Sequence, residues 1–271
     1  MITNGDRSDM THAIVINEQG GPEVLKWQAV DTPEPGPGQI RIRQTAVGLN
    51  YIDCYHRSGL YPLDLPATIG MEAAGIIDAL GDGVTTLSVG DRVAYASGPP
   101  GAYTQSRVIG ADRVVALPES ISDDTAAAMM LQGMTVQYLV RRTYRVQSGD
   151  TVLLHAAAGG VGLIASQWLK QLGATVIGTV GSDEKAELAA AHGCDHTIVY
   201  TRENFTDRVR DITNGEGVAA VYDSIGRDTF FSSLNSLKPH GVMVTFGSAS
   251  GPVDPFAPSE LASRNSLYVT R

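Results

Sequence analysis

The chain has 271 residues and a mass of 28.6 kDa, which is enough for a sizeable core and for two domains. Its net charge of −9, with no block of Lys or Arg, argues against nucleic acid or an anionic membrane as the main partner. Apolar residues make up 43% of the chain, yet no apolar run approaches the about 18 residues of a membrane span.

The N-terminal half has the composition of a β-rich domain. Residues 1–10 lack the apolar core of a signal peptide, so we expect a disordered lead-in and a cytoplasmic protein. Over residues 11–131, Pro/Gly-rich loops separate short alternating segments such as 40–43, which predicts an irregular, barrel-like β domain. From Ser122, an N-cap residue, an Ala/Met/Leu-rich helix is predicted to run toward Tyr144.

Residues 132–271 alternate short apolar strands with helices. We expect strands at 152–154, 174–180, 196–200, 218–223 and 241–246, and helices at 163–172, 183–192, 204–213 and 228–236. This alternation, with its short connections, predicts an α/β fold with a doubly wound parallel sheet of the Rossmann type. Ligands of such sheets bind at the carboxyl ends of the strands, so the segments that follow the strands should face one crevice. These segments are 181–182, Tyr200, 224–226 and 246–248.

A glycine-rich turn, Ala158-Gly159-Gly160-Val161-Gly162, connects the first of these strands to its helix. Glycines there let the backbone approach a pyrophosphate, and the amides at the start of the helix favour an anion. Similar turns also occur where only close packing is needed. The alternating elements of the rest of this half are what favour a nucleotide site.

The end of the second strand indicates which cofactor binds. An NAD site usually has an acidic residue there, which holds the ribose 2′-hydroxyl, whereas this chain has Gly181. Ser182 can donate to a 2′-phosphate and Lys185 can neutralise it, so we predict NADPH. The alternative is that Lys185 is an ordinary solvated helix residue, and the adjacent acidic Asp183 speaks against a phosphate.

Five motifs, in order along the chain, carry a resemblance to a known family. They are GLNYIDCYHRSGLYP, GMEAAGII, VGDRVAY, HAAAGGVGLIASQW and VYDSIGRDTF. The chain resembles the NADPH:quinone oxidoreductases, the zinc-free, zeta-crystallin-like branch of the medium-chain dehydrogenase/reductase superfamily. The resemblance covers essentially the whole chain. It implies a GroES-like β-barrel catalytic domain in front of a Rossmann NADP-binding domain, with a catalytic cleft between them.

The zinc ligands of the related alcohol dehydrogenases are replaced in this chain. Asn50 stands where the first cysteine ligand would be, Met71 replaces a histidine, and only Glu72 remains. We therefore predict no metal site, and a makeshift one from Cys54, His56 and Glu72 is a remote alternative. Without zinc a simple ketone is a poor hydride acceptor, so we expect a quinone or an alkene conjugated to a carbonyl as substrate.

The resemblance also implies roles for individual residues. On the substrate side, Asn50, Tyr55 and Tyr61 would line the nicotinamide, with Asp53 as an orienting group; the alternative is that the tyrosines are packing aromatics. The residues implied on the cofactor side are Thr135, Tyr138, Gly159, Gly160, Val161, Gly181, Ser182, Lys185, Tyr200, Ser224, Phe246, Gly247, Ser248 and Arg271. Gln132 and Gly133 would also lie near the nicotinamide, while Cys54 and His155 are interpreted as packed residues and Tyr103 as a barrel-stabilising one.

The end of the chain departs from the family pattern. Family members continue beyond the strand at 266–271 with a segment that returns to complete the catalytic domain. We therefore expect a truncated or partially represented chain, in which NADPH binding is more robust than turnover. Family members are commonly homodimers joined through the edges of their nucleotide sheets, so we also expect a homodimer.

The sequence is compatible with three functions. The first is NADPH-dependent reduction of quinones, and its nearest rival is reduction of an enone or enal double bond, which needs the same hydride geometry. The third is a non-catalytic NADPH-binding protein of the crystallin or RNA-binding kind. The acidic charge argues against RNA, and the loop with Asn50, Tyr55 and Tyr61 argues against a purely structural role.

Overall fold

The computed structural model describes residues 10–271 and divides them into two compact units, which end and begin at Leu131 and Gln132. Nine of the ten residues predicted as a lead-in lie outside the described residues. The tenth, Met10, belongs to the first strand.

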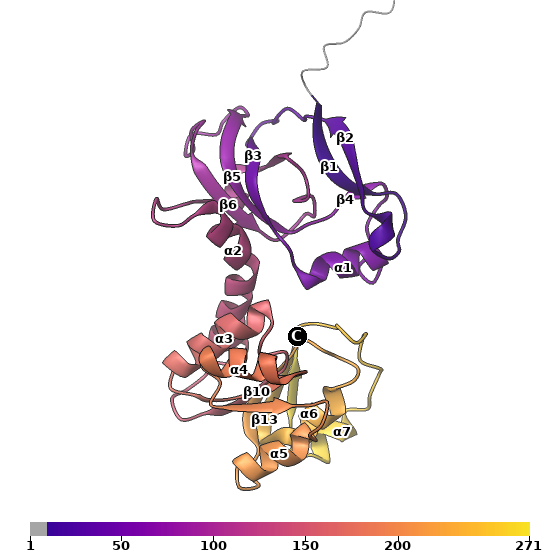
Figure 1. The fold of residues 1–271 in the computed structure, drawn as a ribbon, viewed down its shortest axis with the longest axis vertical. Helices are drawn as coiled ribbons and strands as arrows, with labels where there is room; N and C mark the ends of the chain where they lie inside the picture. The colour runs from indigo at the N-terminus through magenta and orange to yellow at the C-terminus, as the bar shows by residue number, and fades with distance from the viewer. Residues whose placement is uncertain (1–9) are drawn as a thin grey trace, which may run out of the picture. The chain divides into compact units, whose positions relative to one another are not determined.

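The N-terminal unit consists of two antiparallel sheets (Figure 1). The smaller has the order β2-β1-β4, and the larger has the order β7-β3-β5-β6-β8. The strands are β1 (Met10–Ile16), β2 (Lys26–Asp31), β3 (Gln39–Gly48), β4 (Ala67–Thr68), β5 (Glu72–Leu80), β6 (Arg92–Ala96), β7 (Ser106–Gly110) and β8 (Val115–Ala116). Helix α1 (Tyr51–Ser58) follows β3, and single 3-10 turns occupy Pro22–Val24 and Ala111–Arg113.

Alternation along β3 produces the core of this unit. Ile40 and Ile42 are fully buried, whereas Arg41 between them lies on the outer face and bonds Asp78 and Glu34. The buried isoleucines pack with apolar residues of the neighbouring strands, such as Tyr95. Apolar and polar residues thus alternate along β3, so that one side of the strand is buried and the other faces outward, as expected for a β-strand.

Helix α2 (Asp123–Tyr138) begins as predicted, because the Ser122 hydroxyl accepts a hydrogen bond from the Thr125 amide at 3.1 Å. Its end differs from the prediction. Residues Leu139–Thr143 form a π-helical turn, closed by the Tyr144 amide bonding the Leu139 carbonyl five residues back.

The C-terminal unit is built on a six-stranded parallel sheet with the order β11-β10-β9-β12-β13-β14. The strands are β9 (Thr151–Leu154), β10 (Thr175–Val180), β11 (His196–Val199), β12 (Val218–Asp223), β13 (Leu237–Thr245) and β14 (Tyr268–Thr270). From β9 the chain steps outward to β11, crosses back to β12 and steps outward again to β14. This is the doubly wound order, and it confirms the predicted fold class.

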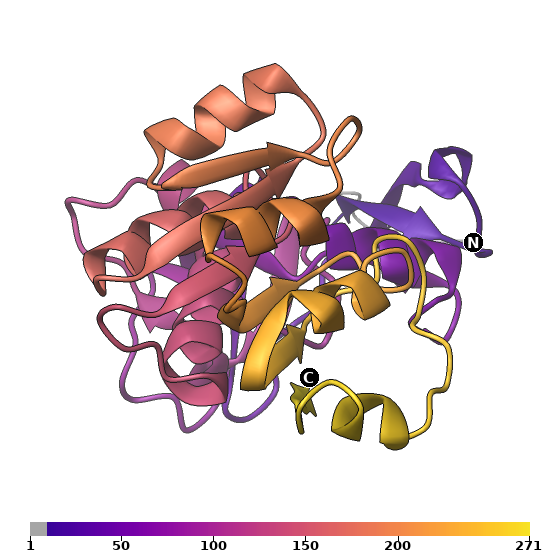
Figure 2. The same cartoon turned by 90° about the horizontal axis from the view of Figure 1, so that it is seen from below.

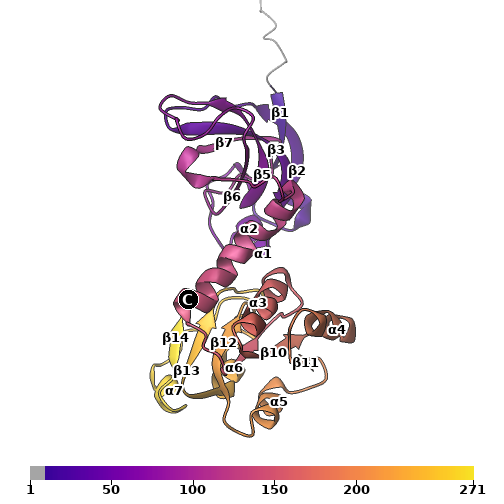
Figure 3. The same ribbon diagram turned by 90° about the vertical axis from the view of Figure 1, so that its left-hand side faces the viewer.

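Helices cover both faces of this sheet (Figure 2, Figure 3). They are α3 (Gly160–Gln171), α4 (Asp183–Ala191), α5 (Phe205–Ile212), α6 (Phe230–Ser236) and the short α7 (Ser259–Ala262). Val152 and Leu154 of β9 pack on the side of α3 and α4, whereas Leu153 packs on the side of α5 and α6. Both faces of the strand are thus buried, as its continuous apolar run indicates.

Two helix starts differ from the prediction by two residues or more. Helix α3 begins at Gly160 rather than at 163, because the Leu163 amide already bonds the Gly159 carbonyl at 2.9 Å. Helix α6 begins at Phe230 rather than at 228, because the Asp228 amide donates to the Ser250 hydroxyl of a neighbouring loop.

No helix within residues 10–271 combines the length and the apolar character needed to cross a bilayer.

Candidate nucleotide site and substrate loop

A cavity of about 660 Å³ lies in the C-terminal unit, at the carboxyl ends of its strands. Its volume falls within the range of small-molecule sites, about 300 to 1,000 Å³. The lining comes from the connections after β9, β10, β11, β12 and β13. The lining residues are His155, Ala156, Ala158, Gly159, Thr179, Val180, Gly181, Lys185, Tyr200, Phe205, Ile225, Asp228, Thr229, Ala249 and Ser250.

The glycine turn after β9 forms one wall of this cavity. Gly159 lines it and is the extended N-cap residue of α3, so the first turn of that helix begins at the cavity wall. Amides in a first helical turn have no acceptor within the helix, and they favour an anion such as a pyrophosphate. A Cβ on Gly162 would lie 2.3 Å from the Ala156 carbonyl oxygen, so close packing also requires a glycine in this turn.

A second corner of the cavity joins Gly181, Lys185 and Tyr200. A Cβ on Gly181 would lie 3.0 Å from the Tyr200 hydroxyl, so the absence of a side chain at the end of β10 makes room for the phenol. Ser182 caps α4, its hydroxyl accepting from the Lys185 amide at 3.4 Å, and a hydroxyl that accepts can also donate. The lining here thus includes an ammonium and a phenol hydroxyl, both of which are groups that can bind a phosphate.

A buried polar network lies beneath the cavity. His155 is 2% exposed, with Nδ1 2.8 Å from the Thr179 hydroxyl and Nε2 2.9 Å from the Ser233 hydroxyl. Burial lowers the pKa of His155, against the smaller opposing effect of Asp223, so the ring is neutral. This confirms the interpretation of His155 as a core histidine with satisfied hydrogen bonds.

Asp223 of the same network fixes the loop that follows β12. Its carboxylate accepts from the amides of Ile225 and Gly226, at 2.7 and 3.0 Å, and from the Thr229 hydroxyl at 2.7 Å. Ile225 and Thr229 both line the cavity. The buried carboxylate thereby holds part of the cavity wall in place.

The remaining residues predicted on the cofactor side are not part of the cavity lining. Ser182, Gly160 and Val161 lie directly beside it in the chain, in the first turns of α4 and α3. Ser224, Phe246, Gly247 and Ser248 follow β12 and β13, and a Cβ on Gly247 would lie 2.6 Å from the Ser224 carbonyl oxygen. Thr135 and Tyr138 lie on α2, and Arg271 follows β14. Their roles stay predictions.

Besides Ala156, Thr179 and Val180, which lie at or just after strand ends, sequence reasoning missed five lining residues in the connections: Phe205, Asp228, Thr229, Ala249 and Ser250. They lie one to five residues beyond the crevice segments that were named, on the loops and first helical turns after β11, β12 and β13. Extending the same carboxyl-end rule by a few residues along each connection would have found them.

In the N-terminal unit, the predicted substrate residues gather around the start of α1. Asn50, Asp53 and Tyr55 are all buried, at 6%, 3% and 9% exposure. One carboxylate oxygen of Asp53 accepts from the Asn50 amide at 2.9 Å and from the Tyr103 hydroxyl at 2.8 Å. Asp53 thus fixes the N-terminus of α1, and Tyr103 stabilises the unit through it.

Three tyrosines form an aromatic cluster on this segment. The ring centroids of Tyr55 and Tyr61 are 5.1 Å apart, and those of Tyr51 and Tyr55 are 5.3 Å apart. The Tyr61 amide donates to the Tyr55 carbonyl at 3.1 Å, which closes the loop after α1. The structure therefore brings Asn50, Tyr55 and Tyr61 together on one short segment.

Glu72 shows what replaces the zinc ligands. It is fully buried, and its carboxylate accepts from the Asn50 side-chain amide at 2.7 Å and from the Leu131 backbone amide at 2.6 Å. Burial raises the pKa of Glu72, an effect that these two donors oppose. Zinc prefers thiolate, imidazole and carboxylate ligands, so an amide directed at the one remaining carboxylate does not fit such a centre. Residues 10–271 hold no group of three or more His, Cys, Asp or Glu that is placed to bind a metal ion.

An antiparallel β unit followed by a doubly wound sheet with this cavity defines a two-domain, nucleotide-dependent dehydrogenase. Residues 36–119 match the family model of the alcohol dehydrogenase GroES-like domain, and residues 160–270 match the model described as zinc-binding dehydrogenase. The chain is 51% identical to quinone oxidoreductase from Pseudomonas aeruginosa and 47% identical to 2-haloacrylate reductase from a Burkholderia species. Each match covers 97% of this chain and 81% of the relative.

Solved structures agree with these relatives. The Escherichia coli quinone oxidoreductase complexed with NADPH superposes with a TM-score of 0.94 at 46% identity, covering 96% of this chain and 80% of the other. The chain therefore belongs to the quinone oxidoreductase family of the medium-chain dehydrogenase/reductase superfamily.

Proposed function

We propose that this protein is an NADPH-dependent quinone oxidoreductase that transfers a hydride without zinc. The observation that carries the proposal is the cavity corner where Gly181, Lys185 and Tyr200 meet, beside the helix N-terminus that follows Gly159. This corner suits a nucleotide with a ribose 2′-phosphate. The relatives named quinone oxidoreductase and the similar NADPH complex support the same assignment.

On the cofactor side, each residue has a binding role. The first-turn amides of α3 hold the pyrophosphate, with Gly159, Gly160 and Val161 keeping side-chain bulk away from it. Lys185, Ser182 and Tyr200 hold the 2′-phosphate by charge and by hydrogen bonds. We assign contacts with the remainder of the cofactor to Thr135, Tyr138, Ser224, Phe246, Gly247, Ser248 and Arg271. The bound cofactor supplies a hydride from its nicotinamide ring.

On the substrate side, the segment around α1 orients an electron-poor acceptor. Tyr55 and Tyr61 offer flat rings against which a quinone stacks, and hydroxyls that donate to its carbonyl oxygen. Such donors stabilise the negative charge that develops on oxygen when the acceptor takes a hydride. Asn50 and Asp53 hold this segment, through the bonds of Asn50 to Glu72 and of Asp53 to Tyr103.

Reduction of a double bond conjugated to a carbonyl is the second candidate. The relative named 2-haloacrylate reductase, at 47% identity, is the observation that favours it. Both reactions need the same oriented hydride, and both place negative charge on a carbonyl oxygen. They differ in the shape of the acceptor that the tyrosine cluster receives.

The test is a side-by-side assay of NADPH oxidation with 1,4-benzoquinone and with an α,β-unsaturated ketone of similar size. We expect kcat/KM to be higher with the quinone. A higher value with the enone would favour the second candidate. Retention of NADPH without oxidation by either acceptor would overturn both in favour of a binding protein.

Three further assignments accompany this proposal. We assign substrate binding to residues 11–131 and NADPH binding to residues 132–271, and we propose that the enzyme acts in the cytoplasm. We also propose a homodimer that pairs through β14, the last strand at one edge of the parallel sheet. Light scattering at several concentrations tests the dimer, and a strictly monomeric result would exclude it.

A further inference from the structure

An acidic residue sits beside the corner that we assign to the 2′-phosphate. Asp183 is the first residue of α4, between Gly181 and Lys185 in the chain. A carboxylate in this part of a Rossmann domain accepts the ribose 2′-hydroxyl of NADH, and it repels a phosphate in the same place. The proposed NADPH site therefore lies beside a group that by itself favours NADH.

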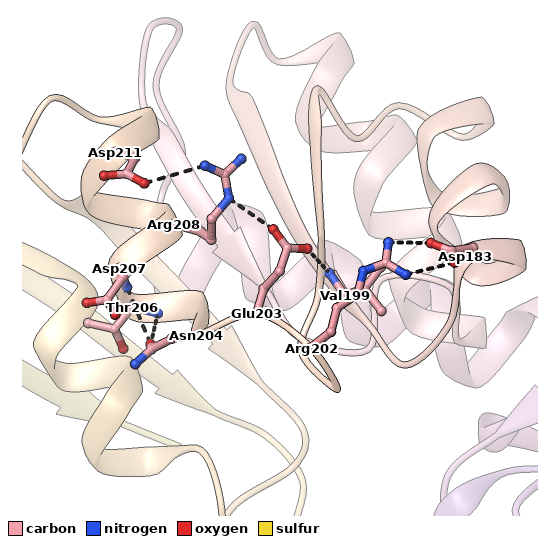
Figure 4. Close-up of polar contacts among 9 residues, drawn as sticks. All are labelled: Asp183, Val199, Arg202, Glu203, Asn204, Thr206, Asp207, Arg208 and Asp211. Carbon is pink, nitrogen blue, oxygen red and sulfur yellow. Dashed lines mark hydrogen bonds and ion pairs between the residues drawn. The ribbon is translucent and has the colours of Figure 1, made fainter.

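Arg202 occupies both oxygens of this carboxylate. Its Nη1 donates to Oδ2 of Asp183 at 2.8 Å, and its Nη2 donates to Oδ1 at 2.5 Å, as Figure 4 shows. Arg202 follows β11 and lies two residues beyond Tyr200, so it reaches α4 from the strand end that also supplies the phenol of the corner. The hydrogen bonds to Arg202 lower the pKa of Asp183, so that the pair is ionic at neutral pH.

The position of the pair separates Asp183 from the cavity. Lys185 and Tyr200 line the cavity, whereas Asp183 is not among its lining residues. Two residues apart on a helix correspond to a rotation of about 200°, so Asp183 and Lys185 point to different sides of α4. The Arg202 fork bonds both oxygens of this carboxylate, which does not line the cavity, and neutralises its charge.

The pair is not needed to fasten the loop between β11 and α5. Glu203 accepts from the Val199 amide at 3.0 Å and from Arg208 at 3.1 Å, and Asn204 caps α5 by accepting from the Thr206 amide at 2.9 Å (Figure 4). The side chains of Arg202 and Asp183 are 58% and 68% exposed, and ion pairs so exposed add little to stability.

Resting on the proposed function, we propose that Arg202 is a specificity-determining residue of this site. By bonding and neutralising the Asp183 carboxylate, Arg202 allows the corner at Lys185 and Tyr200 to bind the 2′-phosphate of NADPH. The same contact leaves NADH without an acceptor for its ribose 2′-hydroxyl. Arg202 acts through Asp183, and is thus a positioning residue for cofactor choice.

The experiment compares the unaltered protein with Arg202→Met, which keeps an unbranched chain of similar length but removes the charge. Dissociation constants for NADPH and for NADH are measured by cofactor fluorescence at low ionic strength. We expect the constant for NADPH to rise about tenfold and that for NADH to stay level or fall, because a freed carboxylate repels a phosphate and attracts a hydroxyl. A higher salt concentration should reduce the increase in the NADPH dissociation constant that Arg202→Met causes.

Rescue distinguishes this role from a structural one. Adding Asp183→Asn to Arg202→Met should return the NADPH-to-NADH ratio close to that of the unaltered protein, since no carboxylate remains to be neutralised. Arg208→Met is the matched control, because this neighbouring arginine pairs with Glu203 and Asp211 instead. It should leave the ratio unchanged. Arg202→Lys, which keeps the charge without the fork, should give an intermediate ratio.

The outcomes separate this inference from the proposed function. If the unaltered protein prefers NADPH but Arg202→Met keeps the same ratio, the inference is wrong and the proposed function stands. The same holds if Asp183→Asn fails to rescue, or if Arg208→Met shifts the ratio as much. An unaltered protein that binds neither nucleotide, or prefers NADH, would overturn both.

Discussion

Gly181 and Tyr200 are in close contact, because a Cβ on Gly181 would lie 3.0 Å from the Tyr200 hydroxyl and would require the phenol to move. The first residue follows β10 and the second follows β11, two neighbouring parallel strands. The absence of a side chain at Gly181, at the end of β10, thus makes room for the phenol of Tyr200 at the end of β11. Under the proposed function, both residues shape the corner that receives the 2′-phosphate.

The first prediction concerns this contact. In Gly181→Ala the new methyl group forces the Tyr200 ring to move by a few tenths of an ångström, so we expect the dissociation constant for NADPH to rise roughly three- to tenfold. Isothermal titration with Gly181→Ala, Tyr200→Ala and the double variant measures the coupling. The two substitutions together should cost less than the sum of their separate effects, and strict additivity would show that the contact is irrelevant to binding.

The second prediction concerns the charge on Lys185. Replacing it with Gln should raise the dissociation constant for NADPH about 10- to 100-fold, because a charge-assisted hydrogen bond is lost. The dissociation constant for NADH should stay within about twofold of its value in the unaltered protein. Lys238→Gln, an exposed lysine on β13 that does not line the cavity, is the control. An equal loss of affinity for NADPH and NADH would show that Lys185 does not bind the 2′-phosphate.

The third prediction concerns the substrate loop. Tyr55→Phe and Tyr61→Phe keep the stacked rings but remove hydroxyls, so kcat with a quinone should fall by about 10- to 100-fold in at least one of them. The dissociation constant for NADPH should not change. Tyr51→Phe, from the same cluster but 59% exposed, is the control. Unchanged turnover in both variants would leave these tyrosines as packing aromatics.

The fourth prediction concerns Glu72 and pH. In an unfolded chain this carboxyl titrates near 4.5, and burial raises its pKa in the folded unit. The folded state therefore binds the proton more tightly, so the stability of the protein relative to Glu72→Gln should fall as pH rises from 4.5 through the raised pKa. Each pKa unit between the two states corresponds to about 1.4 kcal/mol. Urea unfolding at several pH values measures this difference, and a rise with pH would contradict the burial effect.

Much of the nucleotide unit could be predicted from sequence because its signals are local. Apolar runs such as 152–154, separated by helices of ordinary length, determine a parallel sheet. In the N-terminal unit, Ser122 likewise marks a helix start by its own chemistry. What could not be read were contacts between distant residues. The bond from Asn50 to Glu72 and the fork from Arg202 to Asp183 join positions 22 and 19 residues apart, which no local pattern records.

The cavity shows the same limit. The carboxyl-end rule located Gly181 and Tyr200, but it did not show that the glycine makes room for the phenol. Asp183 appeared in the sequence only as an argument against a phosphate. The pairing with Arg202 weakens that argument, because a carboxylate held by a guanidinium no longer acts as a free negative charge.

The most direct test of the account is the rate of NADPH oxidation with 1,4-benzoquinone, measured on protein whose zinc content has been brought below a tenth of stoichiometric by a chelator. The account predicts an undiminished rate that zinc does not increase, with NADH a much poorer donor. A rate that disappears with the metal and returns when zinc is restored would contradict it.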